Sequence, residues 1–565
     1  MSLPLNILWN LFYMRKITQL LLLLLVCNYS LFASRRTLTE MRQALSTLQK
    51  NHRFAAKSSI NKSVNVLHEE EQLTVLGNDG FFAILANDDA FEPILAYSYT
   101  SFDKNDLDNP GFKWWLEAMN QSLDSFSNQN AKANTVSVST AYKPAVDALI
   151  QTKWNQDTPY NNLTPTYTEN DKAVHYVTGC VATAMAQAMK YYNYPEKGKG
   201  TKSYRCKLYI SDKEVITKML TVNFASGTYD WNNMLNVYSK SGYTQEEADA
   251  VARLMYHCGV SVTMDYDKSG SGSYTFKAIK ALIDNFQYSP GLQFYIRAIY
   301  STNEWMDIIC NHLSQGHPII YSGQKEGGGH AFVVDGYDED GRVHVNWGWG
   351  GKSDGYFNIS SLNGYTLEQT MVPVFLDETS VCHAVFGLYD NSVSFSLMGV
   401  NLSASATYVL NGDYRNFEGT MGLLATSLEN GKTSILASNP ISVEGYGINL
   451  QLHFTDLNFK KIDISSMEDG NYRIYLATLR NDDIEWQAVR AADDKSNSAI
   501  LSIASGVAHL TVEKNPSWTI DTEDALEYIV APWKSYSNTI YDLSGRHVQY
   551  PTKGIYIKNG KKVLK

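Results

Sequence analysis

Apolar residues recur at helical spacing in several parts of the chain, and these parts alternate with shorter apolar runs bounded by turn residues. The clearest helical pattern follows Gly179, and its apolar face is made by Val181, Ala184, Met185, Ala188, Met189 and Tyr192. Pro195 comes shortly afterwards, and helices commonly end before a proline. We therefore expect a helix over 181–192 with one buried face, entered from a glycine turn at Cys180.

The region before this helix mixes helical and strand patterns. Leu38, Met41, Leu45 and Leu48 have helical spacing, FFAILANDDAFEPILAYS (81–98) has two apolar runs around an acidic turn, and FKWWLEAMNQSL (112–123) predicts another helix. The polar run NQNAKANTVSVST (128–140) is typical of a linker. Residues 34–142 are therefore expected to form a separate α+β unit in front of the rest of the chain.

A hairpin is predicted around His330. This histidine follows a run of glycines, which allow the chain to pass close to a ligand, and opens an apolar strand over 331–334. The turn DEDG (338–341) then predicts that the chain reverses into a second strand over 342–347. The reversal would place Asn346 and Trp347 beside His330.

Beyond about residue 390 the pattern changes to short alternating strands, as in VSFSLMGVNLSAS (393–405) and YRIYLATLRNDD (472–483). This spacing predicts an immunoglobulin-like β-sandwich over 391–515. PSWTIDTEDALEYI (516–529) is typical of a boundary, and the last segment, 516–565, ends in GIYIKNGKKVLK, which predicts a closing hairpin with a basic end.

Composition narrows the function classes. A chain of 565 residues predicts about three or four domains, and 44% hydrophobic residues suffice for packed cores. The net charge of −10 is spread without basic clusters, so no nucleic-acid partner is indicated.

The N-terminus has the pattern of a secretory signal peptide. Arg15 and Lys16 precede an apolar run over 20–26 that is too short to span a bilayer, and Ala33 is a plausible cleavage position. We therefore expect a signal peptide over 1–33, with Met1 or Met14 as the true start, and a secreted or cell-surface protein with no membrane span after signal removal. A membrane anchor is the alternative.

Candidate chemistry centres on Cys180. Unpaired N–H groups and the positive end of a helix dipole would stabilise its thiolate. A lone cysteine is usually a small buried hydrophobe, but His330 follows about 150 residues later, the cysteine-then-histidine order of papain-like proteases. An amide oxygen of Asn346 could hold the imidazole in one tautomer, with the Trp347 indole excluding water. Upstream, the Gln156 side chain could donate to an oxyanion together with the Cys180 N–H.

The other cysteines and the metal-ligand patterns are less informative. Cys206, Cys258, Cys310 and Cys382 could form two disulfides in any of three pairings or remain free thiols. The sequence contains no CxxC or HxxxH spacing, so neither a metal nor another cofactor is expected.

The wording and order of these motifs resemble the streptopain family (peptidase family C10) of secreted bacterial cysteine proteases. The resemblance rests on WNQDTPYN, TGCVATAMAQAMKYYNYP, SVTMDY, GGGHAFVVDGY and HVNWGWGGKSDGYF, and it covers about 143–390 well and 34–142 more loosely. It implies a papain-like peptidase domain over 143–390 and an inhibitory propeptide over 34–142. By position it makes Cys180 the nucleophile, His330 the general base and Gln156 the oxyanion donor, with Asn346 or Trp347 orienting the imidazole.

Substrate contacts are expected beside this site. Gly329 and Trp349 are candidates for substrate binding, and the indoles of Trp347 and Trp349 are expected to line an apolar pocket for a hydrophobic substrate residue. The SGSGS tract (269–273) is expected to form a loop near the cleft or elsewhere on the surface.

Taken together, the sequence predicts an α+β chain: a papain-like domain preceded by an α+β propeptide and followed by β-sandwich-like modules. The expected function is a secreted cysteine endopeptidase made as a zymogen, which acts on proteins or peptides and is inhibited by its own propeptide. The last segment also resembles C-terminal modules of secreted Bacteroidetes proteins that the type IX secretion machinery reads. The alternatives are an exported Cys-His amidase or acyltransferase acting on cell wall, and a surface binding protein.

Overall fold

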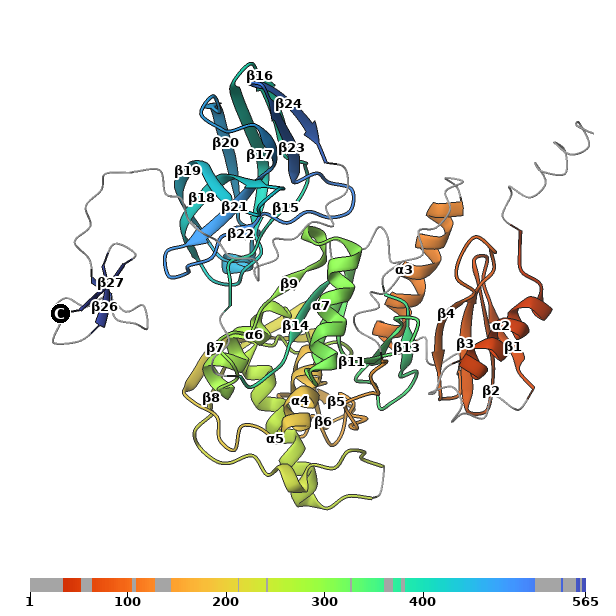
Figure 1. The fold of residues 1–565 in the computed structure, drawn as a ribbon. Coiled ribbons are helices and arrows are strands. Elements are labelled where there is room, and N and C mark those ends of the chain that lie inside the picture. The colour runs from red at the N-terminus through yellow and green to blue at the C-terminus, as the bar shows by residue number, and fades with distance from the viewer. Residues whose placement is uncertain are drawn as a thin grey trace, which may run out of the picture.

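The structure of the protein is a computed structural model, shown in Figure 1. It describes residues 34–51, 63–103, 108–127, 144–211, 213–239, 242–325, 328–359, 369–377, 382–513, 540–541, 555–558 and 561–564. The expected signal peptide (1–33), linker (128–140) and boundary (516–529) lie outside these residues. No helix within the described ranges is long and apolar enough to cross a bilayer.

A ten-stranded antiparallel sheet is built from strands between residues 65 and 373. Its strand order is β1 (Asn65–Glu69), β2 (Leu73–Asn78), β3 (Phe81–Ala86), β4 (Ile94–Ser98), β13 (Gly355–Phe357), β12 (Val343–Asn346), β11 (Gly328–Tyr337), β10 (Ile319–Lys325), β14 (Thr370–Pro373) and β9 (Tyr295–Ile296). The hairpin predicted around His330 is present, because β11 pairs with β12 in antiparallel register and places Val333 opposite Asn346.

The N-terminal region is not the separate unit that the sequence suggested. Strand β4 pairs directly with β13, with Tyr97 opposite Tyr356 and their rings stacked 5.0 Å apart. Trp115 of this region and Val333 of β11 also belong to one hydrophobic core. The first four strands therefore extend the sheet that carries His330, which fixes this region against the remainder of the domain.

Helices α3 (Pro110–Ser127), α4 (Cys180–Tyr192), α6 (Phe276–Phe286) and α7 (Thr302–Ser314) pack against this sheet (Figure 1). Helix α2 (Leu38–Asn51) shares a core with β2 and β3, and α5 (Gln245–Ser261) packs against α4. Short 3-10 turns include η5 (Trp231–Asn233) and η6 (Arg297–Ile299). Two separate hairpins lie beside them: β5 (Thr166–Glu169) with β6 (Lys172–His175), and β7 (Thr201–Ser211) with β8 (Glu214–Asn223).

Helix α4 is more deeply buried than its sequence pattern predicted. Every residue from Val181 to Met189 is buried, rather than one face only, because the helix packs against both β11 and α5. It ends at Asn193, which adopts a left-handed conformation with φ 48°, before Pro195 is reached. Deep burial on several sides fixes the position of Cys180 at its first turn.

The C-terminal third of the chain begins with two antiparallel sheets that share one core. One sheet contains β15 (Phe386–Leu388), β16 (Ser394–Met398), β17 (Asn401–Asn411) and β20 (Phe454–Asp463). The other contains β18 (Phe417–Ser427), β19 (Thr433–Val443), β21 (Gly470–Arg480), β22 (Gln487–Ala488), β23 (Ser498–Ala504) and β24 (Val507–Val512). Leu402 of the first sheet and Ile474 of the second lie in the same buried cluster, as expected for a β-sandwich. Its first strand starts at Phe386, slightly before the expected boundary at 391.

The last described segment is a small sheet of β25 (Ile540–Tyr541), β26 (Ile555–Lys558) and β27 (Lys561–Leu564). Strands β26 and β27 pair in antiparallel register, so the closing hairpin predicted from GIYIKNGKKVLK is present.

Candidate active site

Cys180 is the first residue of α4 and is preceded by Gly179 with φ 89°. A β-carbon at Gly179 would lie 2.7 Å from the Met264 sulfur and 2.9 Å from the Ser271 carbonyl oxygen, so a side chain has no room there. The positive φ also favours glycine. The sequence therefore forms the expected glycine turn, which presents the Cys180 thiol at the N-terminus of a buried helix.

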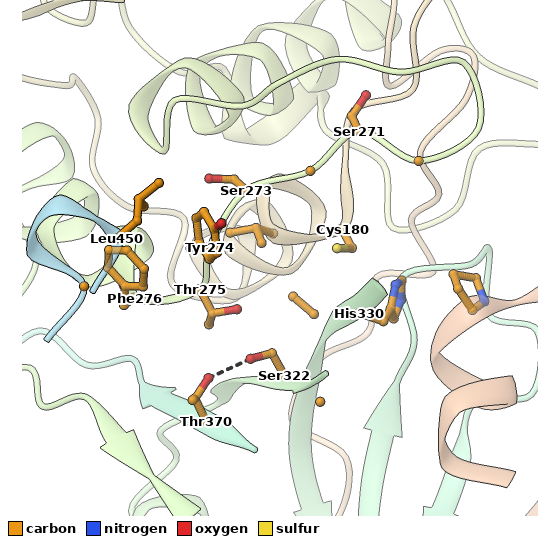
Figure 2. A pocket seen from close by; sticks show the side chains of 18 of the residues that line it. Cys180, Ser271, Ser273, Tyr274, Thr275, Phe276, Ser322, His330, Thr370 and Leu450 are labelled. Atoms are coloured by element: carbon orange, nitrogen blue, oxygen red, sulfur yellow. Dashed lines mark hydrogen bonds between the residues drawn. The ribbon is translucent and has the colours of Figure 1, made fainter. Parts of the chain in front are cut away.

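His330 lies on β11 and faces this thiol, as Figure 2 shows. Its side chain hydrogen-bonds to Cys180, and its Nε2 lies 2.9 Å from the main-chain carbonyl oxygen of Trp347. A carbonyl oxygen can only accept, so Nε2 is the donor and Nδ1 is left for Cys180. The helix and the sheet thus bring together the two groups that a thiol nucleophile and its base require.

The proposed hydrogen bond from Asn346 to the imidazole is not formed. The Asn346 Oδ1 accepts from Gln187 Nε2 at 3.0 Å and from the Gly348 N–H at 3.1 Å, and its Nδ2 donates to the Thr152 carbonyl oxygen at 2.7 Å. Its amide thus joins the end of β12 to Gln187 of α4 and to the main chain at Thr152. The group that orients His330 is instead the backbone carbonyl of Trp347, the next residue.

Trp347 and Trp349 occupy different environments. The Trp347 ring is completely buried, packs 4.8 Å from Phe332, and donates from Nε1 to the Ser353 carbonyl oxygen at 3.0 Å. It therefore belongs to the hydrophobic core beneath the site and, contrary to the expectation, does not line the cavity at Cys180. Trp349 does line the cavity at Cys180, with its ring 6.4 Å from that of His330.

A cavity of about 500 Å³ opens at Cys180 and includes both predicted substrate contacts, Gly329 and Trp349. Gln156 also lines it and is 6% exposed. The main chain of Gln156 is held by the Thr178 N–H, which donates to its carbonyl oxygen at 3.0 Å. Within the described residues its side-chain amide has no hydrogen-bond partner, so its donors are available to a ligand in the cavity.

Electrostatics favour an ion pair. Burial by itself would raise the pKa of the Cys180 thiol, but the hydrogen bond and charge of His330, with the N–H groups of Ala331 and Val181, outweigh it and lower that pKa. Burial by itself would lower the pKa of His330, but its interactions with Cys180 and the Trp347 carbonyl oxygen outweigh burial and raise that pKa. Both shifts widen the pH range in which thiolate and imidazolium coexist.

The other described cysteines, Cys206, Cys258, Cys310 and Cys382, are all free and buried. Burial raises the pKa of Cys206 to about 11 and that of Cys310 to about 12. They therefore differ from Cys180 in both exposure and ionisation. No group of three or more His, Cys, Asp and Glu side chains within the described ranges is arranged to hold a metal ion.

The N-terminal region reaches the site through helix α3. A β-carbon at Gly111 would overlap the His330 Cδ2 and lie 2.7 Å from the Trp347 ring. Pro110 lines the cavity, and the ring of Trp114 covers Gly323, the residue paired with His330 across β10 and β11. Sequence reasoning missed these contacts, although the two tryptophans of FKWWLEAMNQSL marked a helix with an unusually apolar face.

Known protein families match both the region that contains Cys180 and His330 and the N-terminal region. A model of the peptidase C10 family matches residues 154–357, and a model described as Spi protease inhibitor matches residues 33–123. Streptopain of Streptococcus pyogenes serotype M28 is 37% identical over 297 residues, which cover 50% of this chain and 72% of that protein. The chain belongs to the peptidase C10 family.

Two further relatives of this C10 peptidase extend the comparison. The thiol protease/hemagglutinin PrtT of Porphyromonas gingivalis is 30% identical over 393 residues, covering 64% of this chain and 44% of PrtT. The structure of a prointerpain A fragment from Prevotella intermedia, in which a cysteine has been replaced by alanine, is 37% identical with a TM-score of 0.50, covering 55% of this chain and 97% of the fragment. The protein is therefore a cysteine peptidase with a propeptide, and its α+β fold with a papain-like domain is confirmed.

Proposed function

We propose that this peptidase is an exported endopeptidase made as a zymogen, with Cys180 as nucleophile and His330 as general base and acid. The observation that carries the proposal is the Cys180–His330 pair at the cavity, with His330 held by the Trp347 carbonyl oxygen at 2.9 Å. The proposed division of the chain is a signal peptide over 1–33, a propeptide over 34–142, a peptidase domain over 143–390, a β-sandwich over 391–515 and a terminal module over 516–565.

The reaction proceeds through an acyl-enzyme. The Cys180 thiolate attacks the carbonyl carbon of a peptide bond, and the resulting oxyanion accepts hydrogen bonds from the Cys180 N–H and the Gln156 side-chain amide. The His330 imidazolium gives its proton to the departing amine as the C–N bond breaks. Water then attacks the thioester while His330 takes its proton, the C–S bond breaks, and the carboxylic acid leaves.

Latency is attributed to α3. The Gly111 backbone lies against the His330 imidazole, and Pro110 narrows the cavity on that side. A substrate carbonyl approaching Cys180 would meet this segment, so the propeptide must move before peptide bonds can be cleaved.

Export to the cell surface or the medium is proposed because the charged and apolar pattern over 15–26 is typical of a secretory signal peptide. The terminal hairpin of β26 and β27 is the proposed signal for type IX secretion machinery.

The activity is tested by incubating the processed protein with casein and with purified cell wall, each with and without a thiol alkylator. We expect alkylator-sensitive release of peptides from casein, and none from the Cys180→Ala variant. Thiol-dependent release of cell-wall fragments with intact casein would favour the amidase, and turnover of neither substrate would favour a binding protein.

A further inference from the structure

One wall of the catalytic cavity comes from the β-sandwich. The connection between β19 and β20 contains a short segment, 446–452, which we call the sandwich loop and which includes the 3-10 turn η8 (Ile448–Leu450). The sandwich loop lines the same cavity as Cys180 and His330, through Tyr446, Gly447, Leu450, Gln451 and Leu452. It lies outside the residues 154–357 that match the C10 family model.

Internal hydrogen bonds and unusual backbone angles define the conformation of the sandwich loop. Asn449 and Leu450 have φ of 54° and 59°, values that cost energy in residues other than glycine and persist where the surroundings impose them. The Leu450 N–H donates to the Gly447 carbonyl oxygen at 3.0 Å, and the Gly447 N–H donates to the Gln451 carbonyl oxygen at 3.1 Å. These bonds hold the Leu450 side chain on the cavity side of the turn.

Contacts with the peptidase domain fix the loop in place. The Tyr446 ring lies 4.9 Å from Phe294 and 5.8 Å from Phe276, and a β-carbon at Gly447 would lie 2.5 Å from the Phe276 ring. Phe276 opens α6 at the end of the SGSGS loop, which itself lines the cavity. The sandwich loop is therefore packed against the segment that leads back to the catalytic cavity.

The sandwich as a whole is also anchored. Arg490 forms an ion pair with Glu304 at 3.0 Å and lies 4.8 Å from the Tyr300 ring centroid. Val385 and Leu410 belong to the hydrophobic core of the peptidase domain. An apolar interface of this kind opposes independent domain motion.

The end of the cavity at the sandwich loop is open and apolar. Leu450 is 60% exposed and lies beside Phe276 and Tyr274, whereas His330 and Cys180 lie toward the other end (Figure 2). An exposed leucine held in a strained turn at a cavity lined by aromatic rings has the character of a binding surface. Among the described propeptide residues only Pro110 lines this cavity. It precedes Gly111, which lies against His330, so the propeptide reaches the cavity at its catalytic end.

We propose that the sandwich loop forms a subsite for a large apolar side chain of the peptide substrate, with Leu450 packing against that side chain together with Phe276 and Tyr274. The β-sandwich is then part of the substrate-recognition machinery. This inference rests on the proposed endopeptidase function.

The test uses the processed enzyme and a set of otherwise identical peptides that carry leucine or lysine at one position, scanned along both sides of the cleaved bond. Wild-type enzyme should prefer leucine at one position. Leu450→Asp should reduce that preference roughly 10-fold or more, the scale of an apolar pocket contact, through a higher KM for the leucine peptide. The rate of Cys180 alkylation should stay unchanged, since the substitution is away from the thiol.

Leu428→Asp is the matched control, because Leu428 is another exposed leucine of the sandwich that does not line the cavity. It should retain the wild-type preference. A Leu450→Asp enzyme with the wild-type preference at every position would overturn the inference, as would a mass spectrum showing that the active form has lost residues 386–513. Failure of the proposed function would look different: wild type and the Leu428 variant would both lack thiol-dependent cleavage of every peptide, and the inference would fall with it.

Discussion

At the scale of single residues, Cys180 differs from the other thiols in how its charge is stabilised. His330 lowers the pKa of Cys180, whereas burial raises the pKa of Cys206 to about 11. Near pH 6 we therefore expect Cys180 to be alkylated much faster than a free cysteine or than Cys206, because the thiolate is the reactive form. Mass mapping of the alkylated positions measures both rates in one sample.

The pH dependence of activity follows from the same pair. As the pH falls through the lowered pKa of Cys180, the thiolate is protonated and activity is lost. As the pH rises through the raised pKa of His330, the imidazolium that protonates the leaving amine is lost. The profile of kcat/KM should be bell-shaped, and an alkylation rate at pH 6 equal to that of free cysteine would contradict the ion pair.

Gln156 is a second residue whose contribution can be separated. Its buried amide lines the cavity, so removing it should withdraw one hydrogen bond from the oxyanion. In Gln156→Ala we expect kcat to fall about 10- to 1,000-fold with little change in KM. Gln151→Ala, at an exposed glutamine of the same segment, is the control. Unchanged kcat in Gln156→Ala would remove this residue from the mechanism.

At the scale of elements, Asn346 joins strand β12 to helix α4 and does not contact the imidazole. Asn346→Ala would leave Gln187 Nε2 and the Thr152 carbonyl oxygen without their partner, and each unsatisfied buried group costs about 1–3 kcal/mol. We expect a clear loss of thermal stability while the folded protein keeps a fast Cys180 alkylation rate. The reverse result, normal stability with a slow thiol, would restore Asn346 as the group that orients His330.

Helix α3 makes a contact that is specific to the precursor. In Gly111→Leu the larger side chain cannot fit against His330, so the precursor should be more active and should process itself faster than wild type. Lys113→Leu, at an exposed position of the same helix, should not have this effect. Once the propeptide is removed, the variant enzyme has the wild-type sequence and should have wild-type kcat. A Gly111→Leu precursor as latent as wild type would argue against this contact as the block.

The sequence predicts the elements that have a local pattern and misses contacts between distant segments. The helix after Cys180 and the hairpin at His330 were predictable, because helical periodicity and the DEDG turn are local signals. The Trp347 carbonyl was not, since every residue carries a backbone carbonyl. The β4–β13 pairing was also missed, because the pairing of distant strands leaves no local pattern. The same holds for Leu450, whose role depends on how two domains pack.

At the scale of the whole molecule, the pairing of the propeptide strands with the catalytic sheet makes latency a property of the folded chain. Strand β4 is hydrogen-bonded to β13 and Gly111 of α3 lies against His330, so we expect the propeptide to stay in place as long as the chain is uncut over 128–143. Cleavage in this polar segment should therefore release activity. The full-length wild-type precursor should be inactive in a peptide-cleavage assay when freshly purified.

The Cys180→Ala precursor tests whether the enzyme makes this cut itself. The substitution removes the sulfur from a partly exposed position and changes little volume, so the variant should fold and accumulate uncut. A trace of active enzyme should then convert it in trans, as followed on a gel over time. A trace of enzyme that has been alkylated at Cys180 is the matched control and should convert none of it. A variant that matures alone in a protease-free preparation would show that Cys180 does not make the cut. A wild-type precursor as active as the mature form would show that the propeptide does not inhibit this peptidase.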